Sequence, residues 1–396
     1  MHQIIQTLFF IGFFVIAFII ALPCKRLFNI SDAKDHQYKH LDGIRALAAL
    51  SVVGCHSNQY LLTYFGIPGR ALTGDRIGII GVQIFFTLTA YLFTKKALEN
   101  KLNPNSFYMA RVRRIAPLYL VVASITVIMC SYLSLRGYQL TVRAPNDPPM
   151  LLKEIFDIFA FGFLGGVTLN FGSVNALSFI GIAWTLSYEW KFYLVLPLLY
   201  SLYRHSMLMA TVVVLSVLLL AFHDFYVFTN VQWPFFIIGS FSAWLIHHYP
   251  SLSNSKIKSI FGALALLTFI FSIFTSNYFD YKHFFLTGAL FISILIAQPR
   301  ILAFKPLLFL GQISYSIYLL QYLVLFPVQL FVAMHPALVA HSIQKFIVCF
   351  SIGVILIPAA TLSYKLIELP GMEGTFWRQF AFIKNLAWRK QRLLAE

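Results

Sequence analysis

The run MLMATVVVLSVLLLAF at residues 207–222 contains no charged residue. A helix that crosses the hydrocarbon core of a bilayer needs about 20 mostly apolar residues, and many runs of this kind follow one another in the chain. Hydrophobic residues make up 59% of the 396 residues and charged residues 11%, whereas soluble domains carry about 25% charged residues. Membrane β-barrels show short alternating segments instead of continuous apolar runs. The sequence therefore predicts an all-α protein, a polytopic integral membrane helical bundle.

Working outward from this run, we expect about 11 transmembrane helices, one of them at the N-terminus. Most of the 30 lysines and arginines then fall on one side, which the positive-inside rule assigns to the cytoplasm. This topology places the N-terminus outside and the C-terminus in the cytoplasm. The predicted spans are roughly residues 4–22, 42–62, 77–97, 115–135, 184–203, 206–222, 231–248, 257–275, 283–298, 307–331 and 343–366.

The chain divides into three regions. Residues 1–40 are expected to form the extra N-terminal helix and a basic cytoplasmic loop, and residues 371–396 a basic amphipathic cytoplasmic tail. Since Lys25 and Arg26 follow the first apolar run and do not precede it, this run is expected to be a retained span and not a signal peptide. Residues 41–370 form the main membrane domain.

The stretch 136–183 breaks the pattern of spans, because it is rich in Pro, Gly and Asn. We expect an outer loop with re-entrant or interfacial pieces, since irregular backbone at membrane depth is tolerated only against protein or a cavity. A pair of additional spans is the alternative.

The net charge of +16 could suggest a nucleic-acid partner, but the basic loops of a membrane protein explain it. We therefore expect the lipid bilayer as the surroundings and no nucleic acid as a partner. The four cysteines lie in or beside apolar segments and lack the Cys and His spacing of zinc sites. Neither a metal nor a disulfide framework is expected.

Ionisable residues inside spans are candidate functional groups, because burying them in a membrane is unfavourable. Arg45 and His56 lie three helical turns apart in the second span, so both project from one helix face, about 16 Å apart. Glu189, near the start of the fifth span, is expected at the depth of His56, where a carboxylate can orient the imidazole. Structural alternatives remain: Arg45 can extend to the interface and His56 can cap its helix. Glu189 can pair with Lys191 or an arginine.

Three arginines at the cytoplasmic end of the fourth span, Arg111, Arg113 and Arg114, could simply reflect the positive-inside rule. Guanidinium forks also bind phosphates through paired hydrogen bonds. The cluster therefore suits an anionic cytosolic substrate such as a CoA thioester.

Six segments of the chain, in order, resemble those of acyltransferase family 3, membrane acyltransferases that modify bacterial surface carbohydrates. The resemblance covers roughly residues 40–370, and Arg45 and His56 fall on the family's pattern of an arginine, ten residues and a histidine. The segments are LDGIRALAAL with the following His56 (41–56), GVQIFFTLTA (81–90), RVRRIAPLY (111–119), WTLSYEWKFYLVLP (184–197), LGQISYSIYL (310–319) and SYKLIE (363–368).

The resemblance implies an O-acyltransferase of the bacterial inner membrane. It would move an acyl group, acetyl first, from acetyl-CoA or another cytoplasmic acyl-CoA to a hydroxyl of a surface or lipid-linked glycan, such as O-antigen, lipopolysaccharide or exopolysaccharide. No bound cofactor is implied, and His56 would act as general base or nucleophile. The implied residues are His56, Glu189 and Arg45 for catalysis, Arg111, Arg113 and Arg114 for the donor, and Asp42, Ser314 and Tyr315 in support.

The family's usual core has ten spans, so the resemblance implies a ten-span core and residues 4–22 as one additional N-terminal span. The chain also departs from the family's sequence pattern at three places. Gln83 stands where relatives usually carry an acidic residue, Thr89-Ala90 where they have Ser-Gly, and Leu320-Gln321 where most have Trp-His. A proton-coupled transporter of a glycan or small anion is the alternative function, because buried Arg, His and Glu also occur in such carriers. A non-catalytic relative that binds glycan is a third possibility.

Overall fold

The computed structural model describes residues 2–31, 38–64, 72–137, 148–161, 170–171, 174–253, 255–275, 279–335, 337 and 342–376. Most of these residues are helical. The exception is one small antiparallel pair of two-residue strands, β1 (Asn170–Phe171) and β2 (Val174–Asn175), in which Asn170 pairs with Asn175. The expected all-α class is confirmed, and the chain is a multi-pass membrane protein.

Every predicted span coincides with a helix. These helices are α1 (His2–Leu27), α2 (Lys39–Tyr64), α3 (Leu72–Leu98), α4 (Pro104–Leu135), α7 (Ala183–His205), α8 (Met207–Val227), α9 (Phe235–His248), α10 (Ser255–Phe274), α11 (Tyr281–Ala297), α13 (Ser314–Met334) and α14 (Ser342–Ser363).

Within the described residues, 7 helices are long and apolar enough to cross a membrane, and two further apolar helices, α9 and α11, are shorter. The predicted number of about 11 crossings therefore stays a prediction. Outward-facing side chains of the long helices are apolar: on α8, Leu208, Leu219 and Phe222 are each at least 70% exposed. Such a surface suits contact with lipid chains and not with water.

The predicted span 307–331 is wrong in one respect, because it is not one continuous helix: the helix is interrupted at Ile313. The short helix α12 (Lys305–Gln312) ends there and α13 begins at Ser314. The break follows from a close backbone approach: a Cβ at Gly311 would clash with the carbonyl of Asp42 on α2. Gly43 lies equally close to the carbonyl of Leu302, so α12 and the segment before it pack directly on the start of α2.

The stretch 136–183 contains the helix α5 (Pro148–Phe159), the strand pair and the one-turn helix α6 (Leu177–Ile180). Leu152 and Phe156 on α5 are exposed while Ile155 and Ile158 face inward. Within its described part this stretch has no helix long enough to cross a membrane. Residues 138–147, 162–169 and 172–173 lie outside the described residues, as does the tail from residue 377.

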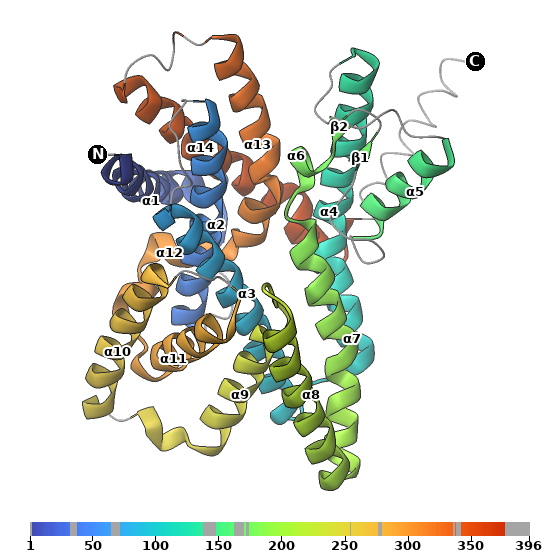
Figure 1. The fold of residues 1–396 in the computed structure, drawn as a ribbon, viewed down its shortest axis with the longest axis vertical. Coiled ribbons are helices and arrows are strands. Elements are labelled where there is room, and N and C mark those ends of the chain that lie inside the picture. The colour runs from blue at the N-terminus through green and yellow to red at the C-terminus, as the bar shows by residue number, and fades with distance from the viewer. Residues whose placement is uncertain are drawn as a thin grey trace.

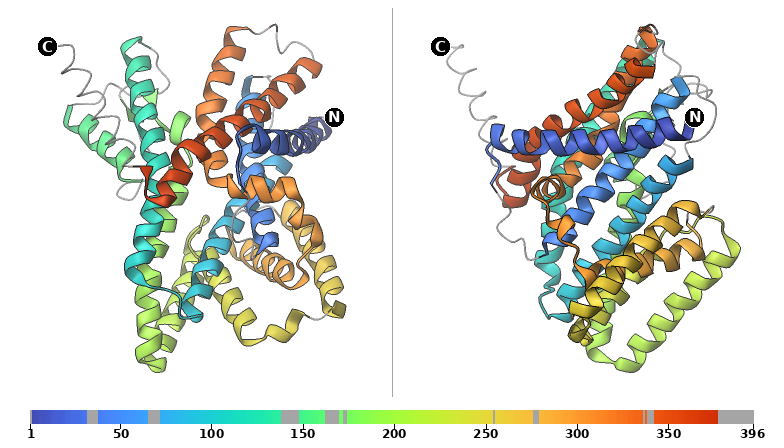
Figure 2. Two further views of the ribbon diagram at one scale, coloured as in Figure 1. Left: turned by 180° about the vertical axis from the view of Figure 1, so that it is seen from behind. Right: turned by 90° about the vertical axis from the view of Figure 1, so that its left-hand side faces the viewer.

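The helices form two groups around α3. Figure 1 shows α4 to α7 on the right and α1, α10, α11, α12 and α14 on the left. Helix α2 packs against α3, α12 and α13, and α3 packs against α7 and α9. The N-terminal α1 lies on α14 and runs across α2 at a large angle (Figure 2). This arrangement brings α2, α3, α4, α7 and α13 around one central space.

Candidate active site

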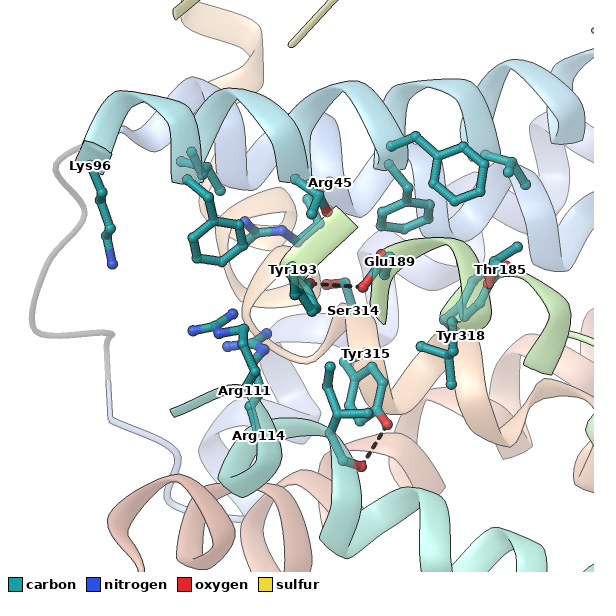
Figure 3. Close-up of a pocket in the computed structure, with 18 residues that line it drawn as sticks. Arg45, Lys96, Arg111, Arg114, Thr185, Glu189, Tyr193, Ser314, Tyr315 and Tyr318 are labelled. Carbon is teal, nitrogen blue, oxygen red and sulfur yellow. Dashed lines mark hydrogen bonds between the residues drawn. The ribbon is translucent and has the colours of Figure 1, made fainter. Parts of the chain in front are cut away.

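A cavity of about 250 Å³ lies where five helices meet. One wall is aromatic and aliphatic, and the other carries the charged side chains Arg45, Arg111, Arg114 and Glu189 (Figure 3). Its lining comes from α2, α3, α4, α7 and α13: Arg45, Val82, Phe85, Phe86, Thr89, Leu92, Phe93, Lys96, Arg111, Arg114, Ile115, Thr185, Leu186, Glu189, Tyr193, Ser314, Tyr315 and Tyr318.

Cationic side chains gather toward one end of this cavity. Lys96, Arg111 and Arg114 lie at that end and Arg45 reaches in beside them (Figure 3). The guanidinium of Arg111 stacks on the ring of Phe93, with its Cζ 4.6 Å from the ring centroid. Its buried Nε finds no hydrogen-bond partner among the described residues. A group of three partly buried arginines and one exposed lysine around a cavity is suited to bind an anion.

The arginine cluster separates into two parts in the structure. Arg111 and Arg114 line the cavity, whereas Arg113 is exposed and lies beside Gly374, where an added Cβ would be 3.3 Å from the Arg113 Cζ. The reason is helical geometry, because residues three apart share a face and their neighbour two positions on points away. Arg111 and Arg114 thus share one cavity and Arg113 does not, and donor binding by the three arginines stays a prediction.

Arg45 is anchored by the carboxylate one turn earlier. Its Nη1 donates to Asp42 Oδ1 at 3.2 Å. Asp42 thus holds the Arg45 guanidinium, and its supporting role in the reaction stays a prediction. The two other supporting residues, Ser314 and Tyr315, both line the cavity, and the Tyr315 hydroxyl donates to the Ile115 carbonyl at 2.8 Å.

Glu189 lies among the arginines. Its Oε2 accepts a hydrogen bond of 2.9 Å from Tyr193 Oη, one turn further along α7, and its side chain lines the cavity with Arg45. His56 does not line this cavity. The expected pairing of Glu189 with His56 is therefore corrected: the carboxylate balances the cationic cluster, because α7 turns this face toward α2 and α4.

A second buried carboxylate binds the same cluster from outside the cavity. The Glu368 side chain is 0% exposed, and its Oε1 lies 3.5 Å from Arg114 Nη2. Its Oε2 accepts a hydrogen bond of 2.8 Å from Ser316 Oγ. It ends a π-helical turn, Tyr364–Glu368. Such turns are rare and frequent at functional sites. Arg114 therefore lies between the cavity and a fixed negative charge that holds its guanidinium in place.

Two hydroxyls lie at the end of the cavity away from Lys96. Thr185 Oγ1 and Tyr318 Oη lie 3.0 Å apart (Figure 3). One turn further along α13, Gln321 is fully buried, and its Nε2 donates to the Tyr318 carbonyl at 2.8 Å. Gln321 Oε1 lies 2.9 Å from His56 Nδ1. Tyr318 thus connects the cavity to the residue that holds His56.

His56 itself is partly buried on α2. The ring of Tyr322 lies against it, with centroids 4.9 Å apart and planes at 37°. Arg45 therefore lines the cavity, whereas His56 lies outside its lining and is connected to it through Gln321 and Tyr318. The common helix face predicted for them agrees with this arrangement.

Several residues of this region were not predicted as site residues. Glu368 and Tyr193 lie within segments that carry the family resemblance, so their position was a usable signal. Lys96 resembled an ordinary loop cation, and Gln321 stood out only as a departure from the family. Gln83, another departure from the family pattern, is buried, and its Oε1 accepts a hydrogen bond of 2.9 Å from Thr287 Oγ1. This contact joins α3 to α11, away from the cavity.

The described residues contain no group of three or more His, Cys, Asp or Glu that could hold a metal ion. Cys24, Cys55 and Cys130 are buried. The side chains that can act on a ligand are thus the cations, the two carboxylates, the hydroxyls and the single imidazole described above.

Comparisons with known proteins agree on one family. The family model described as "Acyltransferase domain" matches residues 38–362. Peptidoglycan O-acetyltransferase OatA of Listeria monocytogenes is 24% identical over 393 residues, covering 87% of this chain and 57% of that protein. O-acetyltransferase OatA of Staphylococcus aureus is 23% identical over 382 residues (87% and 58%), and YrhL of Bacillus subtilis 30% over 379 residues (85% and 55%). The chain thus spans little more than half the length of these relatives. No solved structure matches it.

Proposed function

Because this chain belongs to the acyltransferase family whose model it matches over residues 38–362, we propose that it is a membrane O-acyltransferase. It transfers an acetyl group from acetyl-CoA, or a related acyl group, to a hydroxyl of a cell-envelope glycan. All three relatives above are named for O-acetyl transfer, two of them to peptidoglycan, which supports a glycan acceptor. O-antigen, lipopolysaccharide and exopolysaccharide remain candidate acceptors beside peptidoglycan.

The observation that carries this proposal is the polarity of the cavity. An acyl-CoA has phosphates at one end and a thioester at the end of a flexible arm. The cavity has Lys96, Arg111 and Arg114 at one end, and at the other the Thr185–Tyr318 pair, next to the helix turn that holds His56. In the proposed complex the arginines bind the phosphates through charge-assisted hydrogen bonds, and the thioester points toward His56.

In the proposed reaction, His56 removes the proton of the acceptor hydroxyl as its oxygen attacks the thioester carbonyl carbon. The new C–O bond forms, the C–S bond breaks, and the proton passes to the departing thiolate of CoA. Alternatively, His56 first takes the acyl group as nucleophile and then passes it to the hydroxyl. Arg45 contacts the donor, and Glu189 balances the cationic cluster when the cavity holds no anion.

The proposed function includes a location and an orientation in the membrane. The chain lies in the bacterial inner membrane with the arginine end of the cavity toward the cytoplasm, the N-terminus outside and the C-terminus inside. The donor then enters from the cytoplasm and the acceptor meets the acyl group beyond the Thr185–Tyr318 pair.

The test is mass spectrometry of envelope glycans from cells that make equal membrane amounts of wild type, His56→Ala, Arg45→Ala and His335→Ala. His335 is exposed after the end of α13 and serves as the histidine control. We expect an added acetyl mass with wild type and His335→Ala and none with the other two. If acetyl-CoA is consumed and no glycan gains an acetyl mass, the acceptor is not a glycan, and this part of the proposal is wrong. A wild type that neither cleaves acetyl-CoA nor modifies glycan would favour the transporter.

A further inference from the structure

Gln321 lies between two partners that together determine the direction of its amide. The side chain is 0% exposed. One amide atom lies 2.8 Å from the backbone carbonyl of Tyr318, and the other 2.9 Å from His56 Nδ1. A carbonyl oxygen can only accept hydrogen bonds. The atom beside Tyr318 must therefore be the NH₂ group, and the atom that faces His56 must be the carbonyl oxygen Oε1.

This orientation determines which nitrogen of His56 carries the proton. Since Oε1 is an acceptor, His56 Nδ1 must be the donor, as only one ring nitrogen of a neutral imidazole bears hydrogen. Neutral His56 is then the Nδ1–H form, and its Nε2 holds the lone pair. The Tyr322 ring, 4.9 Å away, packs against the imidazole and restricts its rotation.

We infer that Gln321 is a positioning residue that keeps Nε2 of His56 as the proton-accepting or acyl-accepting atom. The inference rests on the proposed function for the reaction, but the tautomer itself follows from the geometry alone. An amide suits this role in both protonation states of the imidazole, because Oε1 accepts from Nδ1–H whether or not Nε2 is protonated. The His56–Gln321 bond therefore persists while Nε2 takes up and releases a proton.

Gln321 lies outside the donor cavity, which makes its contribution separable from donor binding. A change there is expected to lower kcat and leave the KM for acetyl-CoA unchanged. Partners that orient metal-binding histidines typically contribute about 10- to 100-fold, and we expect an effect of the same order for this histidine. The variants are Gln321→Met, which keeps the length and removes both hydrogen bonds, and Gln321→Glu, which keeps an acceptor for Nδ1–H.

The first measurement is ¹⁵N NMR of wild type labelled at histidine, with the His56 signals identified by their absence in His56→Asn. We expect a protonated Nδ1 and an unprotonated Nε2. A protonated Nε2 in the neutral wild type overturns the inference. This readout does not depend on turnover, so it remains decisive even if Gln321→Met fails to accumulate.

The second measurement is acetyl transfer by the same preparations in proteoliposomes. We expect Gln321→Met to lose at least about tenfold in kcat at unchanged KM, with mixed His56 tautomers, and Gln321→Glu to recover most of the rate. Full activity of Gln321→Met overturns the positioning role. A wild type with the Nδ1–H signal and no transfer to any glycan overturns the proposed function, and with it the catalytic part of this inference, but not the tautomer.

Discussion

Replacement of Arg111 by alanine tests the donor cavity most directly, because Arg113 provides a matched control two residues away. Arg111 lines the cavity and has a buried Nε–H without a partner among the described residues, whereas Arg113 is exposed beside Gly374. Both substitutions remove one cation from the same helix. Only Arg111→Ala removes a donor that the proposed substrate phosphates could reach.

The expected size follows from the environment of each side chain. A hydrogen bond to a charged partner contributes about 1.5–3 kcal/mol, and about 1.4 kcal/mol corresponds to a tenfold change in affinity. Arg111→Ala should therefore raise the KM for acetyl-CoA by about 10- to 140-fold. An exposed charge contributes about 1 kcal/mol or less, so Arg113→Ala should change KM by less than about fivefold.

The assay is the initial rate of CoA release by purified protein in proteoliposomes that contain acceptor, at low and high ionic strength. Since added salt screens exposed charges more than buried ones, the effect of Arg111→Ala should persist at high salt and any effect of Arg113→Ala should fade. Equal increases in KM for the two variants, or no increase for Arg111→Ala at matched protein amounts, would refute the assignment of this cavity to the donor.

Three further predictions concern residues around the cavity. Glu368→Gln weakens the contact that holds Arg114 and should lower thermal stability in detergent and raise the donor KM; an unchanged KM would show that Arg114 needs no such partner. Gly311→Ala forces apart two backbones and should destabilise the protein by about 1–3 kcal/mol. Gly262→Ala is the control, because no atom lies within 4 Å of the Cβ that it adds, and it should leave the melting temperature unchanged or raise it. If the two variants lost the same stability, the close packing of Gly311 on α2 would be contradicted. Thr185→Val removes the hydrogen bond with Tyr318 at the end of the cavity away from Lys96, and faster hydrolysis of acetyl-CoA without acceptor is expected; an unchanged hydrolysis rate would argue against closure there.

Local properties of the sequence were sufficient for the class of the fold and for part of the site. Apolar runs predicted a helix at every position where the structure has a long one, because a membrane requires each backbone to satisfy its own hydrogen bonds. The common face of Arg45 and His56 was also predictable, since both lie on one helix with fixed geometry.

Contacts between helices could not be predicted in the same way. Glu189 was expected near His56, and it lies instead with Arg45, because the rotation of α7 about its axis depends on how α7 packs and not on its own sequence pattern. Likewise, the interruption at Ile313 results from the close approach of Gly311 to α2, which the mostly apolar composition of residues 307–331 does not reveal.

The clearest division is between the residues of α2 and their partners. By itself the sequence determined that a membrane helix carries Arg45 and His56 and that arginines precede α4. Only the tertiary structure decided which side chains meet them: Gln321 is 265 positions from His56 in the chain, and Glu368 binds Arg114 across a similar separation. Such pairs form only where two particular helix faces pack together. The fit of whole helices decides which faces pack, and a single residue contributes little to that fit.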